Sequence, residues 1–255
     1  MGTLEGKHGL IIGVANHNSI AWSIAQKLME EGATLAFTYQ NRFEKNIRKL
    51  LEDKPETPLY PCDVQNDEEM DAVFQSLTDS WGKLDILLHA VAFASPDALN
   101  GRFIDTKRSD FLTSLDISAY SLVSAAHRAE PLMKAAGGGS IITLTYQASQ
   151  WVTPGYNLMA IAKSALEAGV RYLASEMGPN NIRVNAISAG PVRTISAMGV
   201  PGVRDFFSDI EQFAPMRRNI TANDVAEMAA FLSSDGARNI AGQVLYVDSG
   251  TSIMA

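Results

Sequence analysis

A short apolar run near the start of the chain restricts the fold more than any other feature. Residues 9–12 read Gly-Leu-Ile-Ile, without a polar position, which is typical of a strand buried on both faces of a parallel sheet. A loop follows, then a predicted helix at 20–31 with Ser19 at its N-cap, and a second predicted strand at 33–39. This β-loop-α-β opening outlines one nucleotide-binding half of an α/β fold.

The same alternation continues to the end of the chain. Further strands are predicted at 59–62, 84–91, 140–145, 182–188 and 243–248, and further helices at 42–52, 68–81, 109–133, 156–177 and 221–233. The sequence therefore predicts a Rossmann-type α/β fold, a doubly wound parallel sheet with helices on both faces, in a single domain over residues 1–255. Residues 195–218 have no clear period and follow a strand, so we interpret them as a substrate-binding lid, with a plain surface excursion as the alternative.

Composition excludes several functional classes. The net charge of −7 argues against nucleic-acid binding, which needs a basic surface. The one cysteine, Cys62, cannot form an internal disulfide and is interpreted as a packing residue, and the four histidines lack metal-ligand spacing, so no metal is expected. Because the chain has no apolar run of membrane length and no export signal over residues 1–6, we expect a cytoplasmic protein without a membrane partner.

The loop after the first strand could hold a phosphate group. Only Gly13 matches the dinucleotide fingerprint G-x-G-x-x-G, although Ala15 is small enough for close approach. Backbone N–H groups and the Ser19 hydroxyl at a helix N-terminus can nevertheless bind a pyrophosphate. An ordinary turn with a capping serine is the alternative.

Two positions are candidates for the adenosine end of a dinucleotide. The second strand ends in Gln40, where this fold usually has an acid for the ribose, and an amide can make the same hydrogen bond. Arg42 could pair with a 2′-phosphate, but no cation replaces the acid at position 40, so we expect NADH rather than NADPH. Asp63 follows the third strand and could accept from the adenine amine, or it could serve only as a turn residue.

Two phenols and one amine meet around the start of a single predicted helix. Tyr156 and Lys163 are seven positions apart, about two helical turns, and therefore share one face. Tyr146 ends the strand at 140–145, at the sheet edge where ligands bind. A phenol can donate to a carbonyl oxygen that becomes an enolate, and a nearby ammonium favours the negative charge. The alternative is a half-buried aromatic beside a solvated surface lysine.

These motifs together carry a family resemblance. They are Gly13-Val14-Ala15, Ser19-Ile20, Tyr39-Gln40, Cys62-Asp63-Val64, the Tyr146/Tyr156/Lys163 set and the run from Arg183 to Thr194. They closely resemble the NADH-dependent enoyl-[acyl-carrier-protein] reductases of bacterial fatty acid synthesis, a family of the short-chain dehydrogenase/reductase superfamily, and the resemblance runs from residue 6 to residue 253. The spacing Tyr-x6-Lys is its most specific signal, because most superfamily members have Tyr-x3-Lys.

The resemblance implies a role for each matching residue. Hydride from NADH would add to the β-carbon of a trans-2-enoyl thioester, Tyr156 would hold the enolate oxygen, Lys163 would bind the nicotinamide ribose, and Tyr146 would position the substrate. Other cofactor contacts would come from Gly13, Ser19, Ile20, Gln40, Asp63, Val64, Val91, Val192 and Thr194, and other substrate contacts from Ala94 and Met159. The partner would be an acyl carrier protein, and helices 109–133 and 156–177 would assemble a homotetramer.

Some positions depart from the wider superfamily. His89 begins a stretch where the superfamily has Asn-Asn-Ala-Gly, and Asp116 stands where it has a catalytic asparagine. Carbonyl reduction by a short-chain dehydrogenase is therefore the disfavoured alternative, and a non-catalytic dinucleotide sensor is a second. Arg204 is the one basic residue in a stretch where relatives carry several, which weakens the expectation of carrier docking.

Overall fold

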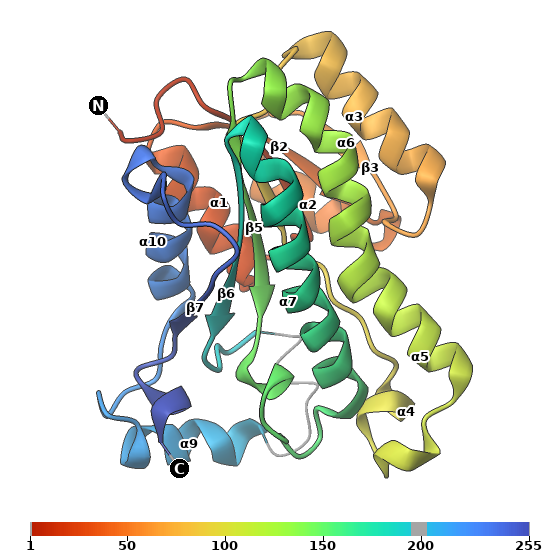
Figure 1. Cartoon of the computed structure of the whole chain (residues 1–255), viewed down its shortest axis with the longest axis vertical. Helices are drawn as coiled ribbons and strands as arrows, with labels where there is room; N and C mark the ends of the chain where they lie inside the picture. Colours follow the sequence, from red (N-terminus) through yellow and green to blue (C-terminus); the bar gives the residue numbers. More distant parts are fainter. Residues whose placement is uncertain (1, 195–202, 255) are drawn as a thin grey trace.

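The computed structural model describes residues 2–194 and 203–254 and contains one parallel sheet with helices on both faces (Figure 1). Its described strands are β1 (His8–Ile12), β2 (Thr34–Tyr39), β3 (Leu59–Pro61), β4 (Ile86–His89), β5 (Gly139–Thr145), β6 (Ile182–Ala189) and β7 (Val244–Val247). Their order in the sheet is β3-β2-β1-β4-β5-β6-β7, and every neighbouring pair is parallel. The direction of winding reverses between β1 and β4, where this fold leaves a crevice at the carboxyl ends of the strands.

Two hydrophobic cores cover the two faces of the sheet. The helices are α1 (Ile20–Glu30), α2 (Glu44–Leu50), α3 (Asp67–Ser80), α4 (Pro96–Leu99), α5 (Arg108–Leu115), α6 (Ser121–Ala135), α7 (Asn157–Met177), α9 (Val203–Phe213) and α10 (Ala222–Ser233). Ile11 of β1 packs with α1, α2 and α10, whereas Leu10 and Ile12 pack with α3, α6 and α7. An unbroken apolar strand is needed because both faces of β1 are buried. The predicted doubly wound fold is confirmed.

The predicted helix at 109–133 contains an irregular turn. The structure runs from α5 into a π-helix, Asp116–Tyr120, and then into α6. Ser118 Oγ accepts a hydrogen bond from the Phe93 backbone N–H at 2.9 Å, and Ser121 Oγ donates to the Ile117 carbonyl at 2.6 Å. Such single π turns often occur at functional sites. Hydrophobic period does not reveal them, because one inserted residue leaves the pattern on either side intact.

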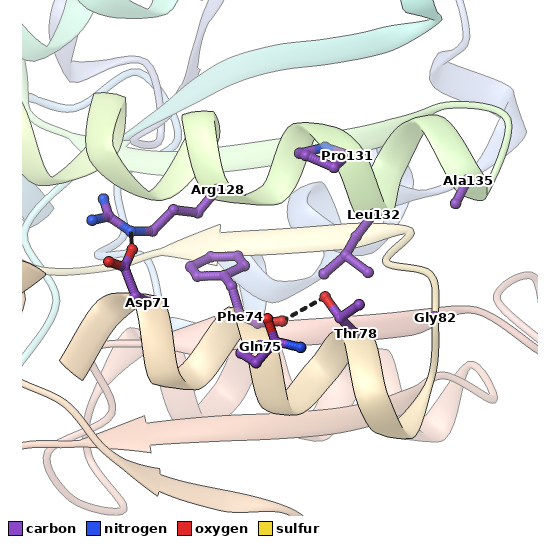
Figure 2. Close-up of a pocket in the computed structure, with 9 residues that line it drawn as sticks. All are labelled: Asp71, Phe74, Gln75, Thr78, Gly82, Arg128, Pro131, Leu132 and Ala135. Atoms are coloured by element: carbon purple, nitrogen blue, oxygen red, sulfur yellow. Dashed lines mark hydrogen bonds and ion pairs between the residues drawn. The ribbon is translucent and has the colours of Figure 1, made fainter. Parts of the chain in front are cut away.

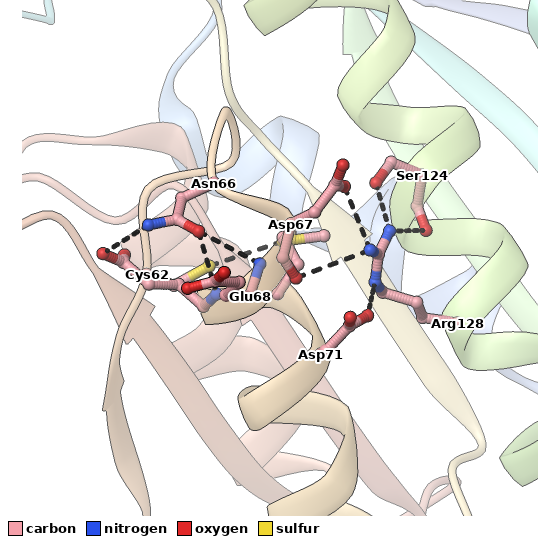
Figure 3. A network of polar contacts seen from close by, with 9 residues as sticks. Cys62, Asn66, Asp67, Glu68, Asp71, Ser124 and Arg128 are labelled. Carbon is pink, nitrogen blue, oxygen red and sulfur yellow. Dashed lines mark hydrogen bonds and ion pairs between the residues drawn. The ribbon is translucent and has the colours of Figure 1, made fainter.

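A charged cluster joins α3 to α6 on one face of the sheet (Figure 3). The Arg128 guanidinium donates to Asp71 Oδ1 at 2.6 Å and to Asp67 Oδ1 at 3.0 Å. Its pKa rises because both carboxylates favour the charged form, against the opposing effect of burial. The cluster fixes α6, and with it the π-helix, against the neighbouring helix.

A cavity of about 500 Å³ lies beside this cluster, between α3 and α6 (Figure 2). Phe74 and Leu132 form part of its apolar wall, and Gly82, just before β4, closes one end. It is therefore at the amino-terminal side of β4, away from the carboxyl ends of the strands.

Among the helices of the described residues, none combines the length and hydropathy of a membrane-crossing helix.

Candidate active site

The carboxyl ends of the strands gather most of the residues that the sequence singles out. Figure 1 shows the strand arrows pointing toward the end of the molecule where α4 and α9 lie. The residues just beyond these ends are Gly13 after β1, Gln40 after β2, Asp63 and Val64 after β3, Val91 and Ala94 after β4, Tyr146 after β5, and Val192 and Thr194 after β6. Sequence position relative to the strands was enough to predict this grouping.

The two tyrosines face each other at this edge. Their ring centroids are 5.0 Å apart at 55°, a tilted aromatic pair. Tyr156 was the predicted first residue of this helix, but it stands at the N-cap of α7, one residue before the observed start at Asn157. Gly155 and Asn157 on either side have positive φ, of 75° and 37°, which turns the chain so that the Tyr156 ring enters the site. Asn157 Nδ2 holds this turn by donating to the Leu99 carbonyl at 3.1 Å.

Both phenols are protonated at neutral pH. Burial raises the pKa of Tyr156 well above its ordinary value, and the nearby Tyr146 adds to the rise. Burial also raises the pKa of Tyr146. A neutral phenol is a hydrogen-bond donor, so each of these O–H groups has a proton that it could donate to a substrate oxygen.

Lys163 is buried, so the alternative of a solvated surface lysine is wrong. Only 6% of the residue is exposed, and its ammonium donates to the Leu144 carbonyl at 2.8 Å. Burial lowers the pKa of Lys163 to about 8, while the charge of Glu167 acts in the opposite direction. The site thus holds a lysine that is mostly charged at neutral pH but close to its titration point. It stands in the second turn of α7, the helix whose N-cap is Tyr156.

His89 is a structural residue at the floor of the site. Its ring nitrogens lie 3.0 Å from Thr143 Oγ1 and 2.7 Å from Ser121 Oγ, and it is fully buried. Burial lowers the pKa of His89 to about 3, and the charge of Lys163 contributes. A histidine with that pKa is neutral at physiological pH and is not a general acid. It joins β4 and β5 to the start of α6, a role that the sequence did not reveal.

The phosphate loop shows why glycine is required at position 13. Gly13 has φ of 108°, and a Cβ there would lie 2.3 Å from the Ala90 carbonyl oxygen. The loop can therefore cross the end of β4 only without a side chain. Ser19 is an N-cap as predicted, with Oγ accepting from the Trp22 N–H at 3.3 Å, and Ile20 begins α1. The first turn of α1 has no acidic residue, which leaves its positive end available for an anion.

Gln40 and Asp63 are brought into direct contact at the adenosine end. Gln40 Nε2 donates to Asp63 Oδ2 at 2.7 Å, and the Asp63 N–H donates to Glu69 Oε2 at 2.6 Å. Asp63 also forms the turn considered as its alternative role, since its Oδ1 accepts from the Gln65 N–H at 3.1 Å. Glu69 was not singled out from the sequence, because it lies inside α3 and looks like an ordinary helix-surface acid.

Asp116, which the sequence suggests takes the place of the superfamily asparagine, begins the π-helix. Its Oδ2 accepts from Gln65 Nε2 at 2.8 Å, which links the π-helix to the loop after β3. The hydrogen-bond partner of this acid therefore lies in the loop after β3.

The remaining predicted residues divide between packing and the site edge. Met159 is buried on α7, Val192 is buried, and Val64 and Val91 pack against the α3/α6/α7 core. The Thr194 N–H donates to the Val192 carbonyl at 2.7 Å.

Residues 195–202 of the predicted lid lie outside the described residues, and so does the side chain of Arg204. The described part of the predicted lid begins with α9. There the Phe207 ring centroid lies 5.2 Å from the Arg193 guanidinium carbon.

Cys62 is confirmed as a packing residue. It is buried against Met70, with the two sulfur atoms 3.4 Å apart. Burial raises the pKa of the Cys62 thiol to about 12, so it is not a nucleophile at neutral pH.

Comparison with known proteins agrees with this geometry. The profile of a family described as enoyl-(acyl carrier protein) reductase matches residues 13–252. The Nostoc sp. protein named enoyl-[acyl-carrier-protein] reductase [NADH] FabI is 51% identical over 98% of each chain, and the Synechocystis sp. protein of the same name is 49% identical over 98% of each chain. The crystal structure of the Bacillus cereus enoyl-acyl carrier protein reductase with NADP+ and indole naphthyridinone superposes with a TM-score of 0.97, at 45% identity and full coverage of both chains. The chain therefore belongs to the enoyl-(acyl carrier protein) reductase family.

Proposed function

We propose that this protein reduces the carbon–carbon double bond of trans-2-enoyl thioesters on an acyl carrier protein, using NADH, in type II fatty acid synthesis. The observation that carries this proposal is the contact between the Tyr146 and Tyr156 rings beside the buried Lys163. The relatives' names, with enoyl-acyl carrier protein reductase and NADH, support the same reaction and cofactor.

Tyr156 is proposed to stabilise the enolate oxygen. When bound, the cofactor supplies the hydride that adds to the β-carbon of the thioester. The negative charge then moves to the thioester oxygen, where the Tyr156 O–H donates a hydrogen bond in a partly buried, low-dielectric position. The raised pKa of Tyr156 keeps this proton on the phenol, so the proton that the α-carbon takes to complete the reduction comes from solvent. Tyr146, packed on the same ring, orients the substrate.

Lys163 is proposed to bind the ribose next to the nicotinamide. Its ammonium has three donor hydrogens, and the Leu144 carbonyl takes one of them. The others can reach ribose hydroxyls, while the positive charge favours the developing enolate. Val91, Val192 and Thr194 are proposed to contact the nicotinamide half of the cofactor, and Ala94 and Met159 to contact the substrate.

The residues present fit a dinucleotide. The N-terminus of α1, with Gly13, Ser19 and Ile20, suits the pyrophosphate because it offers N–H donors and no acid in its first turn. Gln40, Asp63 and Val64 suit the adenosine. The Asp63 carboxylate, hydrogen-bonded to Gln40, would repel a 2′-phosphate, and the Arg42 guanidinium lies 4.6 Å above the Phe43 ring. This chemistry favours NADH over NADPH.

Three further features complete the proposal. The chain acts as one catalytic domain in the cytoplasm, with residues 195–218 as the lid over the acyl chain. It assembles as a homotetramer through α5–α6 and α7. Large apolar side chains exposed on these helices support that assembly, and they are Leu112, Tyr120, Val123, Ile161 and Tyr172.

The test is the loss of NADH absorbance when the purified protein meets an enoyl thioester, with NADPH and a 3-oxoacyl thioester in parallel. Turnover with NADH and the enoyl substrate alone is the expected result. Turnover of the 3-oxoacyl substrate instead would show that the site reduces a carbonyl group. Binding of NADH without turnover of either substrate would favour the non-catalytic sensor.

A further inference from the structure

A buried carboxylate lies one helical turn beyond Lys163. Glu167 is 5% exposed, although nothing in the proposed reaction uses an acid at this position. A buried carboxylate is costly unless it has a hydrogen-bond donor and a nearby cation. Its Oε1 accepts from Thr145 Oγ1 at 2.7 Å, and the cation next to it on α7 is Lys163. Residues four apart on a helix are neighbours on its surface.

Glu167 and Lys163 make two parallel bridges from α7 to β5. Lys163 donates to the carbonyl of Leu144, and Glu167 accepts from the hydroxyl of the next residue, Thr145. The chain then enters the site at Tyr146. The two bridges therefore set the position of α7 on the last residues of β5, directly before one of the two site tyrosines.

The charge of Glu167 reaches several groups around the site. It opposes the lowering of the Lys163 pKa by burial, and it contributes to a raised pKa of Tyr246 on β7. The other titratable groups on elements around α7 and the site are His89 on β4, Asp116 on the π-helix, Tyr146 after β5, Tyr156 at the helix start and Asp248 after β7. Glu167 is the charged group that opposes the effect of burial on Lys163, and Thr145 is its hydrogen-bond donor.

We propose that Glu167 is a positioning residue for the reduction, which keeps the Lys163 ammonium charged and aimed at the cofactor ribose while Thr145 fixes the carboxylate. The inference rests on the proposed ribose role of Lys163. It assigns to α7 an acid–base pair in which only the lysine touches the cofactor.

The test is the pH dependence of NADH affinity in Glu167→Gln, followed by NADH fluorescence. Glutamine keeps the side-chain shape and an oxygen that can accept from Thr145, but it removes the charge. Without that charge the buried ammonium loses its proton at lower pH, because burial favours the neutral amine. The midpoint of the loss of affinity should therefore move to lower pH by about one to two units, for unit charges about 6 Å apart at an effective dielectric constant of about 20.

Two control variants separate the charge from a structural effect. Glu176→Gln makes the same change at an exposed glutamate on α7 and should leave the midpoint in place. Glu167→Asp keeps the charge but draws it back by one methylene. Its midpoint should therefore lie between those of wild type and Glu167→Gln. If Glu167→Gln does not fold, Glu167→Asp carries the test, with a smaller shift in the same direction expected.

The outcomes distinguish the inference from the function on which it rests. Unchanged NADH affinity in Lys163→Ala would reject the ribose role itself. Weak binding in Lys163→Ala, together with a wild-type midpoint in the folded Glu167 variants, would overturn the inference alone. A loss of affinity by one constant factor at every pH would likewise overturn it, since that is the behaviour of a merely structural residue.

Discussion

Replacing Tyr156 by phenylalanine is the most direct test of the proposed mechanism, because it removes one oxygen atom and leaves the ring. The ring contact with Tyr146, at 5.0 Å between centroids, needs no hydroxyl. The turn around Gly155 and Asn157 is set by backbone conformation and by the Asn157 hydrogen bonds, so it should also persist. The variant should therefore fold with nearly the wild-type Tm.

The size of the effect follows from the role of the hydroxyl. Loss of one oxyanion donor in an enclosed site typically costs about 10² to 10³ in kcat, equivalent to roughly 3–4 kcal/mol. Lys163 remains and still supplies positive charge, so the lower end of this range, about a hundredfold, is expected. The affinity for NADH should change little, because the Tyr156 hydroxyl is assigned to the substrate.

Steady-state turnover of an enoyl thioester, with NADH affinity measured separately, provides the assay. Tyr146→Phe is the matched control, since it makes the same atomic change in the partner ring. A positioning residue predicts a smaller loss there, about tenfold or less, seen mainly in KM. Full activity of Tyr156→Phe, or a larger loss in Tyr146→Phe, would refute the assignment of the oxyanion donor.

Three other perturbations test the supporting structure. Gly13→Ala should lower the free energy of unfolding by about 2–4 kcal/mol in thermal denaturation, because its Cβ would lie 2.3 Å from the Ala90 carbonyl oxygen at a φ of 108°; a wild-type Tm would contradict this. Gln40→Arg should shift the ratio of NADPH to NADH affinity by about ten- to a hundredfold through a charge-assisted bond to the 2′-phosphate, and equal ratios would show that position 40 does not contact the ribose. His89 has a folded-state pKa of about 3, below its ordinary 6.5, so its contribution to stability is complete above 6.5 and is lost as the pH falls toward 3. His89→Gln cannot be protonated there and should flatten the acid side of the stability curve relative to wild type, by up to about 1.4 kcal/mol per pH unit; parallel curves would argue against a neutral buried imidazole.

Local sequence signals predicted the elements and their caps well. Ser19 caps α1 as predicted, and Thr221, the first residue of the helix predicted at 221–233, caps α10 through a capping box with Asp224. Such signals act over three or four residues, so they can be recognised without knowing what packs nearby. The largest differences were two residues at each end, at the fourth strand, predicted over 84–91 and observed at Ile86–His89, and at the helix predicted over 42–52 and observed at Glu44–Leu50. The short helix α4 was not predicted, because four residues carry no period.

The family and the site region could also be read from the chain alone. Parallel strands place their carboxyl ends along one edge, so residues that follow successive strands must meet there. Tyr146 was identified in this way, whereas Tyr156 and Lys163 were identified by their seven-residue spacing on one predicted helix, which also specifies the family. What each residue does within the site stays a prediction that the variants above will test.

Tertiary structure decided the state of those side chains. A lysine at helical spacing from a tyrosine has the same sequence signal whether it is buried or solvated, and only packing of α7 on β5 buries Lys163 beside Glu167. The Gln40–Asp63 hydrogen bond joins residues 23 positions apart, and the His89 contacts join three separate elements. The sequence by itself determined the order of strands and helices, because propensity, capping and hydrophobic period are local properties. Burial, pKa and hydrogen-bond partners depend on which distant segments pack together, and these only the folded chain decided.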